Sequence, residues 1–159
     1  MSTQELQELI ETLAQTPEAI ANLVHDLSND DLRWRNENGE FSAIENVCHL
    51  RDIEVEGYTV RINRIINQEN PFLADIDGGR LAVERDYNSQ NPDQALQAFA
   101  SARADNVRTL RSLRPEQLGR AGTLEGVGSI TLEKLLMLMC EHDDGHLDDL
   151  RIICRRLAN

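Results

Sequence analysis

Cysteine is scarce in this chain, and the few cysteines present form no paired motif. The chain has three cysteines among 159 residues, Cys48, Cys140 and Cys154, and no Cys-x-x-Cys sequence. A low, odd count argues against a disulfide-stapled secreted scaffold and predicts a reducing compartment. Long apolar runs are also missing, since none approaches the ~20 residues that span a bilayer, and the first residues form no basic, apolar leader. We therefore expect a cytoplasmic protein with no membrane segment.

Basic residues are outnumbered by acidic ones. The chain has 16 Lys and Arg residues against 28 Asp and Glu residues, which gives a formal net charge of -12 at pH 7. Such a negative field repels phosphate backbones and anionic lipid surfaces, so neither nucleic acid nor a membrane is an expected partner. The spacing of Gly122, Gly126 and Gly128 matches neither a phosphate loop nor a dinucleotide fingerprint. The charge itself identifies no substrate.

Helical signals dominate the rest of the sequence, in four long segments over residues 3–27, 43–67, 92–113 and 131–157. The first segment contains Thr16-Pro17, which predicts either two short helices or one kinked helix. Ser42-Ala-Ile-Glu45 is a capping box that begins the second segment. Asn91-Pro92-Asp93 caps the start of the third.

The connections between these segments differ in length. Ser28 to Leu32 predicts a short capped turn, and residues 71–88 form a long irregular connection in which residues 81–84 could make one helical turn. Residues 119–129 predict a turn with a few extended residues. Four amphipathic helices with long, unequal connections predict an all-α fold, a four-helix bundle, as a single domain over residues 1–159.

Two histidines, His142 and His146, lie one helical turn apart inside the apolar stripe of the last segment. The stripe is defined by apolar residues at three- and four-residue steps: Leu132, Leu135, Leu136, Met139, Leu150, Ile153 and Leu157. Neutral imidazoles four residues apart can direct their nitrogens at one point beside the helix, which is why His-x-x-x-His recurs in helical metal sites. The alternative is a pair of core histidines satisfied by hydrogen bonds.

The other two histidines carry weaker signals. His49 falls outside the apolar stripe of the second segment and shares a flank with Glu45, Asp52 and Glu56. Periodicity alone predicts that this flank is solvated. His25 is expected on the surface near the end of the first segment.

Four further residues are candidates for supporting roles, although no catalytic residue can be assigned. Asp143 falls in the apolar stripe of the last segment, where it would orient a histidine, accept a proton, or pair with a neighbouring helix. Glu45, one turn before His49, is a second candidate for orienting a histidine, but its capping role is the more economical explanation. Trp34 and Phe41 are expected to pack as aromatic core beneath the loop before residue 43, with a pocket wall as the alternative.

Several motifs occur together in an order that resembles one known family. They are Leu32-Arg-Trp34, Phe41-Ser-Ala-Ile-Glu-Asn-Val-Cys-His-Leu50, Ile130-Thr-Leu-Glu-Lys-Leu-Leu136 and Glu141-His-Asp-Asp-Gly-His-Leu147. In this order they look like the DinB-like superfamily of DinB/YfiT-like metalloenzymes, and the resemblance covers nearly the whole chain.

The resemblance implies a bundle of four long helices, often dimeric, in which three histidines converge on a divalent metal. Carried over by position, these are His49, His142 and His146. Relatives in the superfamily include thiol-dependent S-transferases and a thiol-dependent isomerase. The resemblance therefore implies a low-molecular-weight thiol as co-substrate and a homodimer as the assembly.

A site of three neutral histidines has a chemical consequence of its own. It leaves a divalent ion its full charge and at least one open coordination position, as in catalytic rather than structural zinc sites. We expect zinc or nickel, with iron as a further choice. The first hypothesis is a metal-dependent S-transferase that joins a low-molecular-weight thiol to an electrophilic small molecule. A small-molecule substrate is expected only from this metal-site hypothesis. A metal-dependent hydrolase and a non-catalytic bundle that binds a metal or a small ligand are the alternatives.

Overall fold

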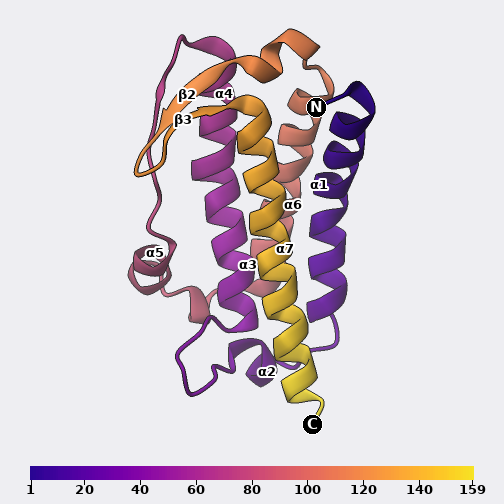
Figure 1. Ribbon diagram of the computed structural model, residues 1–159. Helices are drawn as coiled ribbons and strands as arrows, with labels where there is room; N and C mark the ends of the chain where they lie inside the picture. The colour runs from indigo at the N-terminus through magenta and orange to yellow at the C-terminus, as the bar shows by residue number, and fades with distance from the viewer.

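The computed structural model describes residues 1–159, and long helices account for most of the chain (Figure 1). They are α1 (Thr3–Val24), the run of α3 (Ala43–Asp52), η1 (Ile53–Tyr58) and α4 (Thr59–Asn67), then α6 (Pro92–Arg111) and α7 (Leu132–Leu157). The connections contain α2 (Asn29–Arg33), β1 (Phe72–Leu73), α5 (Gly78–Glu84), the 3₁₀ turns η2 (Tyr87–Ser89) and η3 (Pro115–Gly119), β2 (Ala121–Leu124) and β3 (Gly128–Thr131). The predicted four-helix bundle with unequal connections is confirmed.

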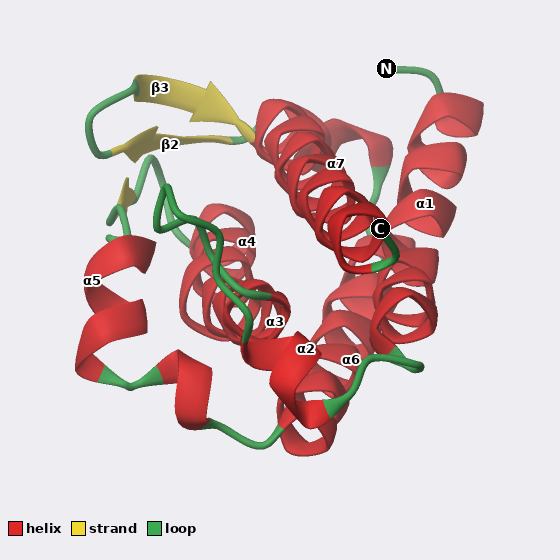
Figure 2. Ribbon diagram, turned by 90° about the horizontal axis from the view of Figure 1, so that it is seen from below, coloured by secondary structure: helices red, strands yellow, loops and turns green.

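The four long helical segments pack as a four-helix bundle with a roughly square cross-section. α1 and α3 lie opposite each other, and α6 and α7 each pack against both of them. Seen from below in Figure 2, α2 lies across one end of the bundle and α5 lies outside the α3–α4 run. The start of α3 and the C-terminal part of α7 both lie in the half of the bundle that α2 covers, and the two helices pack against each other there (Figure 1). None of the helices combines the length with the apolar character that crossing a bilayer requires.

Local hydrogen bonds fix where α3 and α7 begin. The Ser42 hydroxyl accepts a bond from the amide of Glu45 at 3.3 Å, and the Glu45 carboxylate accepts one from the amide of Ser42 at 2.9 Å. The Thr131 hydroxyl accepts a bond from the amide of Lys134 at 3.2 Å and so caps α7. The capping box predicted from the sequence is therefore present, and such caps hold a helix start in place.

α1 is one continuous helix through Pro17, not two short ones. Proline has no N–H, so the carbonyl of Leu13, four residues earlier, loses its usual helical donor. Arg103 of α6 replaces that donor, because its Nη1 donates to the Leu13 oxygen at 2.9 Å. A side chain from a neighbouring helix thus compensates for the proline.

Two features add to the predicted all-α architecture. The second long helix is not uniform, because η1 is a π-helical segment that includes Gly57. A small sheet in the order β1-β2-β3 stands where only a few extended residues were expected, with β1 parallel to β2 and β2 antiparallel to β3. Phe72 pairs with Thr123, so the sheet ties the connection after α4 to the hairpin before α7.

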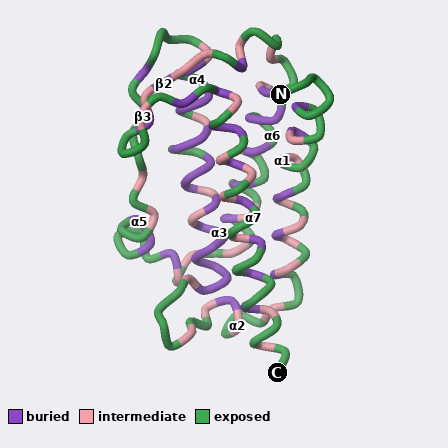
Figure 3. Tube along the Cα trace, in the orientation of Figure 1, coloured by how far each residue is buried: buried purple, intermediate pink, exposed green.

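The apolar core is divided into two clusters by a buried polar layer. Buried positions recur along each of the long helices (Figure 3). One cluster contains Leu13 and Met139, and the other contains Ile20 and Leu150. Between them, Arg103 is 1% exposed and bonds to buried carboxylates of the other helices. The bundle therefore contains a buried charged cluster between its two apolar clusters, and one member, Asp143, directly follows His142 in the sequence.

Candidate metal centre

Three histidines from two helices converge between α3 and α7. His49 comes from the second turn of α3, and His142 and His146 come from adjacent turns of α7. One nitrogen of each ring can be chosen so that all three lie within 4.8 Å of one another. The structure thus brings together the pair indicated by the His-x-x-x-His spacing and the third histidine implied by the family resemblance.

The imidazole rings lie close enough to share one small space. Nε2 of His49 lies 3.0 Å from Nε2 of His142. The ring centroid of His146 lies 4.6 Å from the centroids of both other rings. Phe41 packs against His49, with ring centroids 5.5 Å apart. Each histidine is only partly accessible to solvent.

All three rings are neutral at pH 7. Burial, together with the nearby His146, lowers the pKa of His49 to about 4 and that of His142 to about 3. Burial also lowers the pKa of His146. Neutral imidazoles have an unprotonated nitrogen, which is the form that binds a metal.

The donor set fits a divalent metal. Nε2 of His49 and Nε2 of His142 face each other at 3.0 Å, and these are the atoms that the two rings offer to an ion at a shared position. Neutral imidazole nitrogens are ligands for zinc, nickel and iron. Three of them, held by two packed helices within reach of a common point, would bind one ion and leave its other positions to a small ligand.

Asn46 is a residue of the site that the sequence analysis did not single out. It lies on α3 one turn before His49, is 1% exposed, and places its Oδ1 2.7 Å from Nδ1 of His146. Periodicity does not distinguish Asn46 from any other polar residue near the start of a helix. The only signal in the sequence was its place in the family motif around His49.

The two carboxylates expected to support the histidines are engaged elsewhere. Asp143 accepts bonds from Nη1 and Nη2 of Arg103, at 2.6 and 3.1 Å, so it pairs with a neighbouring helix. Glu45 keeps its bond to the Ser42 amide and accepts another from Nε of Arg35 at 2.9 Å. Burial acts to raise the pKa of Glu45, but these bonds hold it below its usual value. Neither carboxylate hydrogen-bonds a histidine.

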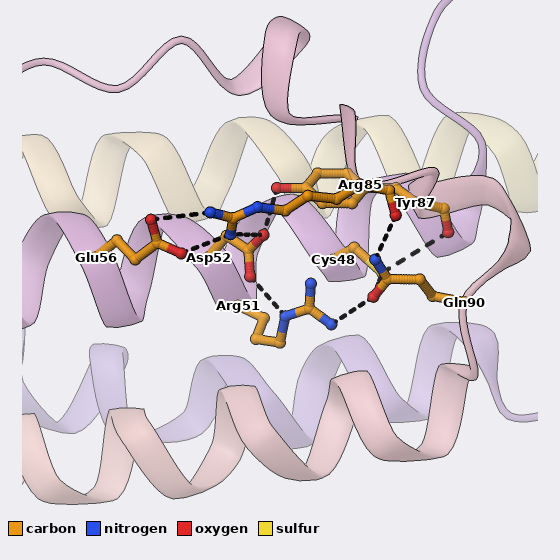
Figure 4. A network of polar contacts seen from close by, with 7 residues as sticks. All are labelled: Cys48, Arg51, Asp52, Glu56, Arg85, Tyr87 and Gln90. Carbon is orange, nitrogen blue, oxygen red and sulfur yellow. Dashed lines mark hydrogen bonds and ion pairs between the residues drawn. The ribbon is translucent and has the colours of Figure 1, made fainter. Parts of the chain in front are cut away.

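A polar network fastens the connection between α4 and α6 onto α3 (Figure 4). Asp52 accepts bonds from the Tyr87 hydroxyl at 2.6 Å and from Arg85 Nη1 at 2.8 Å. Arg85 also bonds to Glu56 at 2.5 Å. Asp52 is consequently 5% exposed. The prediction of a solvated flank is therefore wrong at Glu45, His49 and Asp52, which are covered, and right at Glu56, which is exposed.

A pocket of about 190 Å³ lies at the end of the bundle near α2, and no histidine lines it. Its apolar wall includes Trp34, Phe41 and Ile152. Phe41 also touches His49, and Asp149, another lining residue, has Oδ2 3.8 Å from Nδ1 of His146. Trp34 is 37% exposed, so its prediction as core is wrong. It directly follows the short α2, and it forms a pocket wall instead.

Comparisons with known proteins agree with this architecture. The family model described as the DinB superfamily matches residues 12–150. A protein of Oceanobacillus iheyensis, named a putative metal-dependent hydrolase, is 26% identical over 151 residues, which cover 95% of this chain and 87% of that protein. The structure of YfiT from Bacillus subtilis, described as a probable metal-dependent hydrolase with an unusual four-helix bundle topology, superposes with a TM-score of 0.93.

The similarity to YfiT extends over 99% of this chain and 90% of that one. At 21% sequence identity it supports the fold alone. The family model carries the assignment, because its match covers most of the chain and includes His49, His142 and His146. This chain belongs to the DinB superfamily.

Proposed function

We propose that this protein is a divalent-metal-dependent S-transferase that joins a low-molecular-weight thiol to an electrophilic small molecule. The observation that carries the proposal is the convergence of three neutral imidazoles, with His49 Nε2 and His142 Nε2 3.0 Å apart. A divalent ion bound by three neutral nitrogens keeps its full charge and lowers the pKa of a thiol or a water molecule at its open position. The protein holds the three histidines on two packed helices, where they are largely shielded from solvent.

The surrounding carboxylates favour a thiol as the nucleophile. Glu45 is paired with Arg35, and both Glu54 and Asp143 are paired with Arg103, so these buried acids are not free to act as a base. A thiol, with an ordinary pKa near 8.5, needs far less help to lose its proton than water does. Asp149, near His146, is 59% exposed, so the site holds no free buried carboxylate and suits thiol chemistry better than water activation.

The pocket near α2 provides a place for the electrophile. Trp34, Phe41 and Ile152 offer an apolar surface, and Arg156, paired with Glu40 at 3.6 Å, adds a polar rim. Because Phe41 touches both this pocket and His49, a substrate lying on the apolar wall comes close to the histidines. We infer that the electrophile has an apolar or aromatic body.

Hydrolysis is the second candidate. It is supported by the names of the relative from O. iheyensis, a putative metal-dependent hydrolase, and of YfiT, a probable metal-dependent hydrolase. In that case water takes the place of the thiol, and the same histidines and the same pocket serve the reaction.

Metal content is the first measurement. Untagged protein, analysed by plasma mass spectrometry, is expected to contain one divalent ion per chain, zinc or nickel before iron. His49→Ala, His142→Ala and His146→Ala are expected to lose it. His25→Ala is the matched control, because His25 is exposed at the end of α1 and away from the cluster. A wild-type protein that stays empty after incubation with zinc, nickel and iron would overturn the proposal.

The reaction type is then tested on the metal-loaded protein. Thiols such as cysteine and glutathione are combined with 1-chloro-2,4-dinitrobenzene, and 4-nitrophenyl acetate is supplied without thiol. Thiol-dependent consumption of the electrophile, lost in His142→Ala, supports transfer. Ester hydrolysis without thiol, lost in the same variant, supports the hydrolase instead. Metal binding without either activity favours a bundle that only binds.

We also propose that the protein is a homodimer, an assembly that stays a prediction from the family resemblance. Size-exclusion chromatography with light scattering measures it directly. A mass equal to that of one 18.0 kDa chain at micromolar concentration would contradict the dimer.

A further inference from the structure

Asn46 has only one orientation that its neighbours allow. Its Nδ2 lies 3.0 Å from the carbonyl oxygen of Ser42 and 3.4 Å from that of Phe41. A carbonyl oxygen can only accept a hydrogen bond, so the amide nitrogen of Asn46 must face these two atoms. A flipped amide would place Oδ1 against both carbonyls. The oxygen of the Asn46 side chain therefore faces α7.

That orientation decides where His146 carries its proton. Oδ1 of Asn46 lies 2.7 Å from Nδ1 of His146. Since Oδ1 can only accept, Nδ1 must be the donor, and the proton of the neutral ring is on Nδ1. We infer that Asn46 is a positioning residue, which holds His146 in the tautomer whose Nε2 presents a free lone pair to the metal position.

Asn46 is the partner on which this tautomer depends. Asp149 is the other polar group near the ring, but its Oδ2 is 3.8 Å from Nδ1 and its side chain is 59% exposed, so it is too distant for a hydrogen bond. His49 and His142 lack any partner at Nδ1. Of the three rings, His146 is therefore the one whose ligand nitrogen is chosen in advance by the protein, and α3 contributes to the site through Asn46 as well as through His49.

The tautomer can be read in the metal-free protein. Two-bond ¹H–¹⁵N correlation spectra, recorded in the presence of a chelator, distinguish the nitrogen that carries the proton from the one that does not. We expect Nδ1 of His146 to be protonated in the wild type. In Asn46→Leu, which removes the acceptor and has a similar volume, we expect the proton to move largely to Nε2. A wild-type His146 protonated on Nε2 would overturn the inference without any variant.

Zinc affinity tests the consequence, and this step rests on the metal site of the proposed function. Competition with a chelator is expected to show about a 10- to 100-fold weaker zinc complex for Asn46→Leu, the usual loss when the partner of a histidine ligand is removed. Asn46→Asp is the matched variant, because it also loses the bonds to Phe41 and Ser42 but keeps an acceptor toward His146. It should bind zinc nearly as tightly as the wild type.

Equal zinc affinity in Asn46→Leu and the wild type would refute the positioning role, and so would equal losses in Asn46→Leu and Asn46→Asp. The second result would mean that Asn46 only supports the segment before α3, through its bonds to Phe41 and Ser42. Neither readout involves turnover, so an inactive protein would count against the proposed function and not against this inference.

Discussion

Gly78, the first residue of α5, lies directly against the ring of His49. A Cβ added to Gly78 would come within 2.3 Å of Cε1 and 2.5 Å of Nδ1 of that histidine. No side chain can occupy this space unless the ring or α5 moves. The connection between α4 and α6, fastened by Arg85 and Tyr87, thus sets the position of His49 from outside the bundle.

Gly78→Ala is therefore expected to disturb the candidate metal site. Overpacking of this kind costs about 1–3 kcal/mol of stability, and displacement of His49 should weaken zinc binding by about tenfold or more. Gly79→Ala is the control one residue along, because its Cβ would meet only Asp77 Oδ1, at an ordinary 3.5 Å. Zinc competition and urea unfolding measure both effects. Indistinguishable zinc affinities in the two variants would show that His49 does not depend on this contact.

The buried pairing of Arg103 predicts a large loss of stability in Arg103→Met. Its guanidinium bonds to Glu54 at 2.8 Å, to Asp143 at 2.6 Å and to the carbonyl of Leu13 at 2.9 Å. Removing one partner of a buried ion pair costs about 3–5 kcal/mol, because the remaining charges are left unpaired. Urea unfolding should show a loss of this size.

Two controls isolate that buried charge. Arg108→Met, on the same helix but with an ion pair to Asp105 that is 77% and 66% exposed, should change stability by about 0.5 kcal/mol or less. Adding Glu54→Gln and Asp143→Asn to Arg103→Met should restore much of the lost stability, since no charged side chain then remains in this buried cluster. No restoration would mean that lost packing, not unpaired charge, causes the effect.

Much of the fold could be predicted because its signals are local. The caps at Ser42 and Thr131 depend on residues three positions apart, and the pair His142 and His146 belongs to one helix. The family resemblance, since confirmed, supplied His49. Periodicity alone placed His49 on a solvated flank, because buried polar residues leave the same pattern as exposed ones.

What could not be predicted depends on contacts between distant segments. Asp52 is buried because Arg85 and Tyr87, far along the chain, pair with it. Arg103 looks like an ordinary polar residue of α6 until Pro17 of α1 frees the carbonyl that it binds. The apolar stripe includes Asp143, but the sequence leaves its partner open between a histidine and a neighbouring helix.

The single tryptophan offers a direct signal for occupation of the pocket. Trp34 is the only tryptophan in the chain, and it is 37% exposed in the pocket wall. We expect acrylamide to quench its fluorescence readily, and an aromatic electrophile bound in the pocket to reduce this quenching. Ile152→Glu, which places a charge in the same wall, should remove the protection. Protection that persists unchanged in this variant would place the ligand elsewhere.

The lowered pKa values of the histidines predict that the metal-free protein loses stability in weak acid. In the unfolded chain a histidine binds a proton below about pH 6.5, whereas folded His49 and His142 do so only near pH 4 and 3. Between these values the unfolded state binds more protons, so the free energy of unfolding falls as the pH falls, by up to about 1.4 kcal/mol per pH unit for each histidine. The stability that depends on the neutral histidines is fully present above about pH 6.5. It is lost as the pH falls through the pKa values of the folded protein.

Urea unfolding at pH 7, 6 and 5 in the presence of a chelator measures this slope. Carboxylates also titrate toward pH 4, so the comparison with His142→Leu isolates the histidine contribution. This variant should show a pH dependence that is shallower by roughly 1 kcal/mol per pH unit. Parallel curves for the wild type and the variant would mean that His142 becomes protonated as easily in the folded protein as in the unfolded chain, and that the three rings do not form a neutral, metal-ready set.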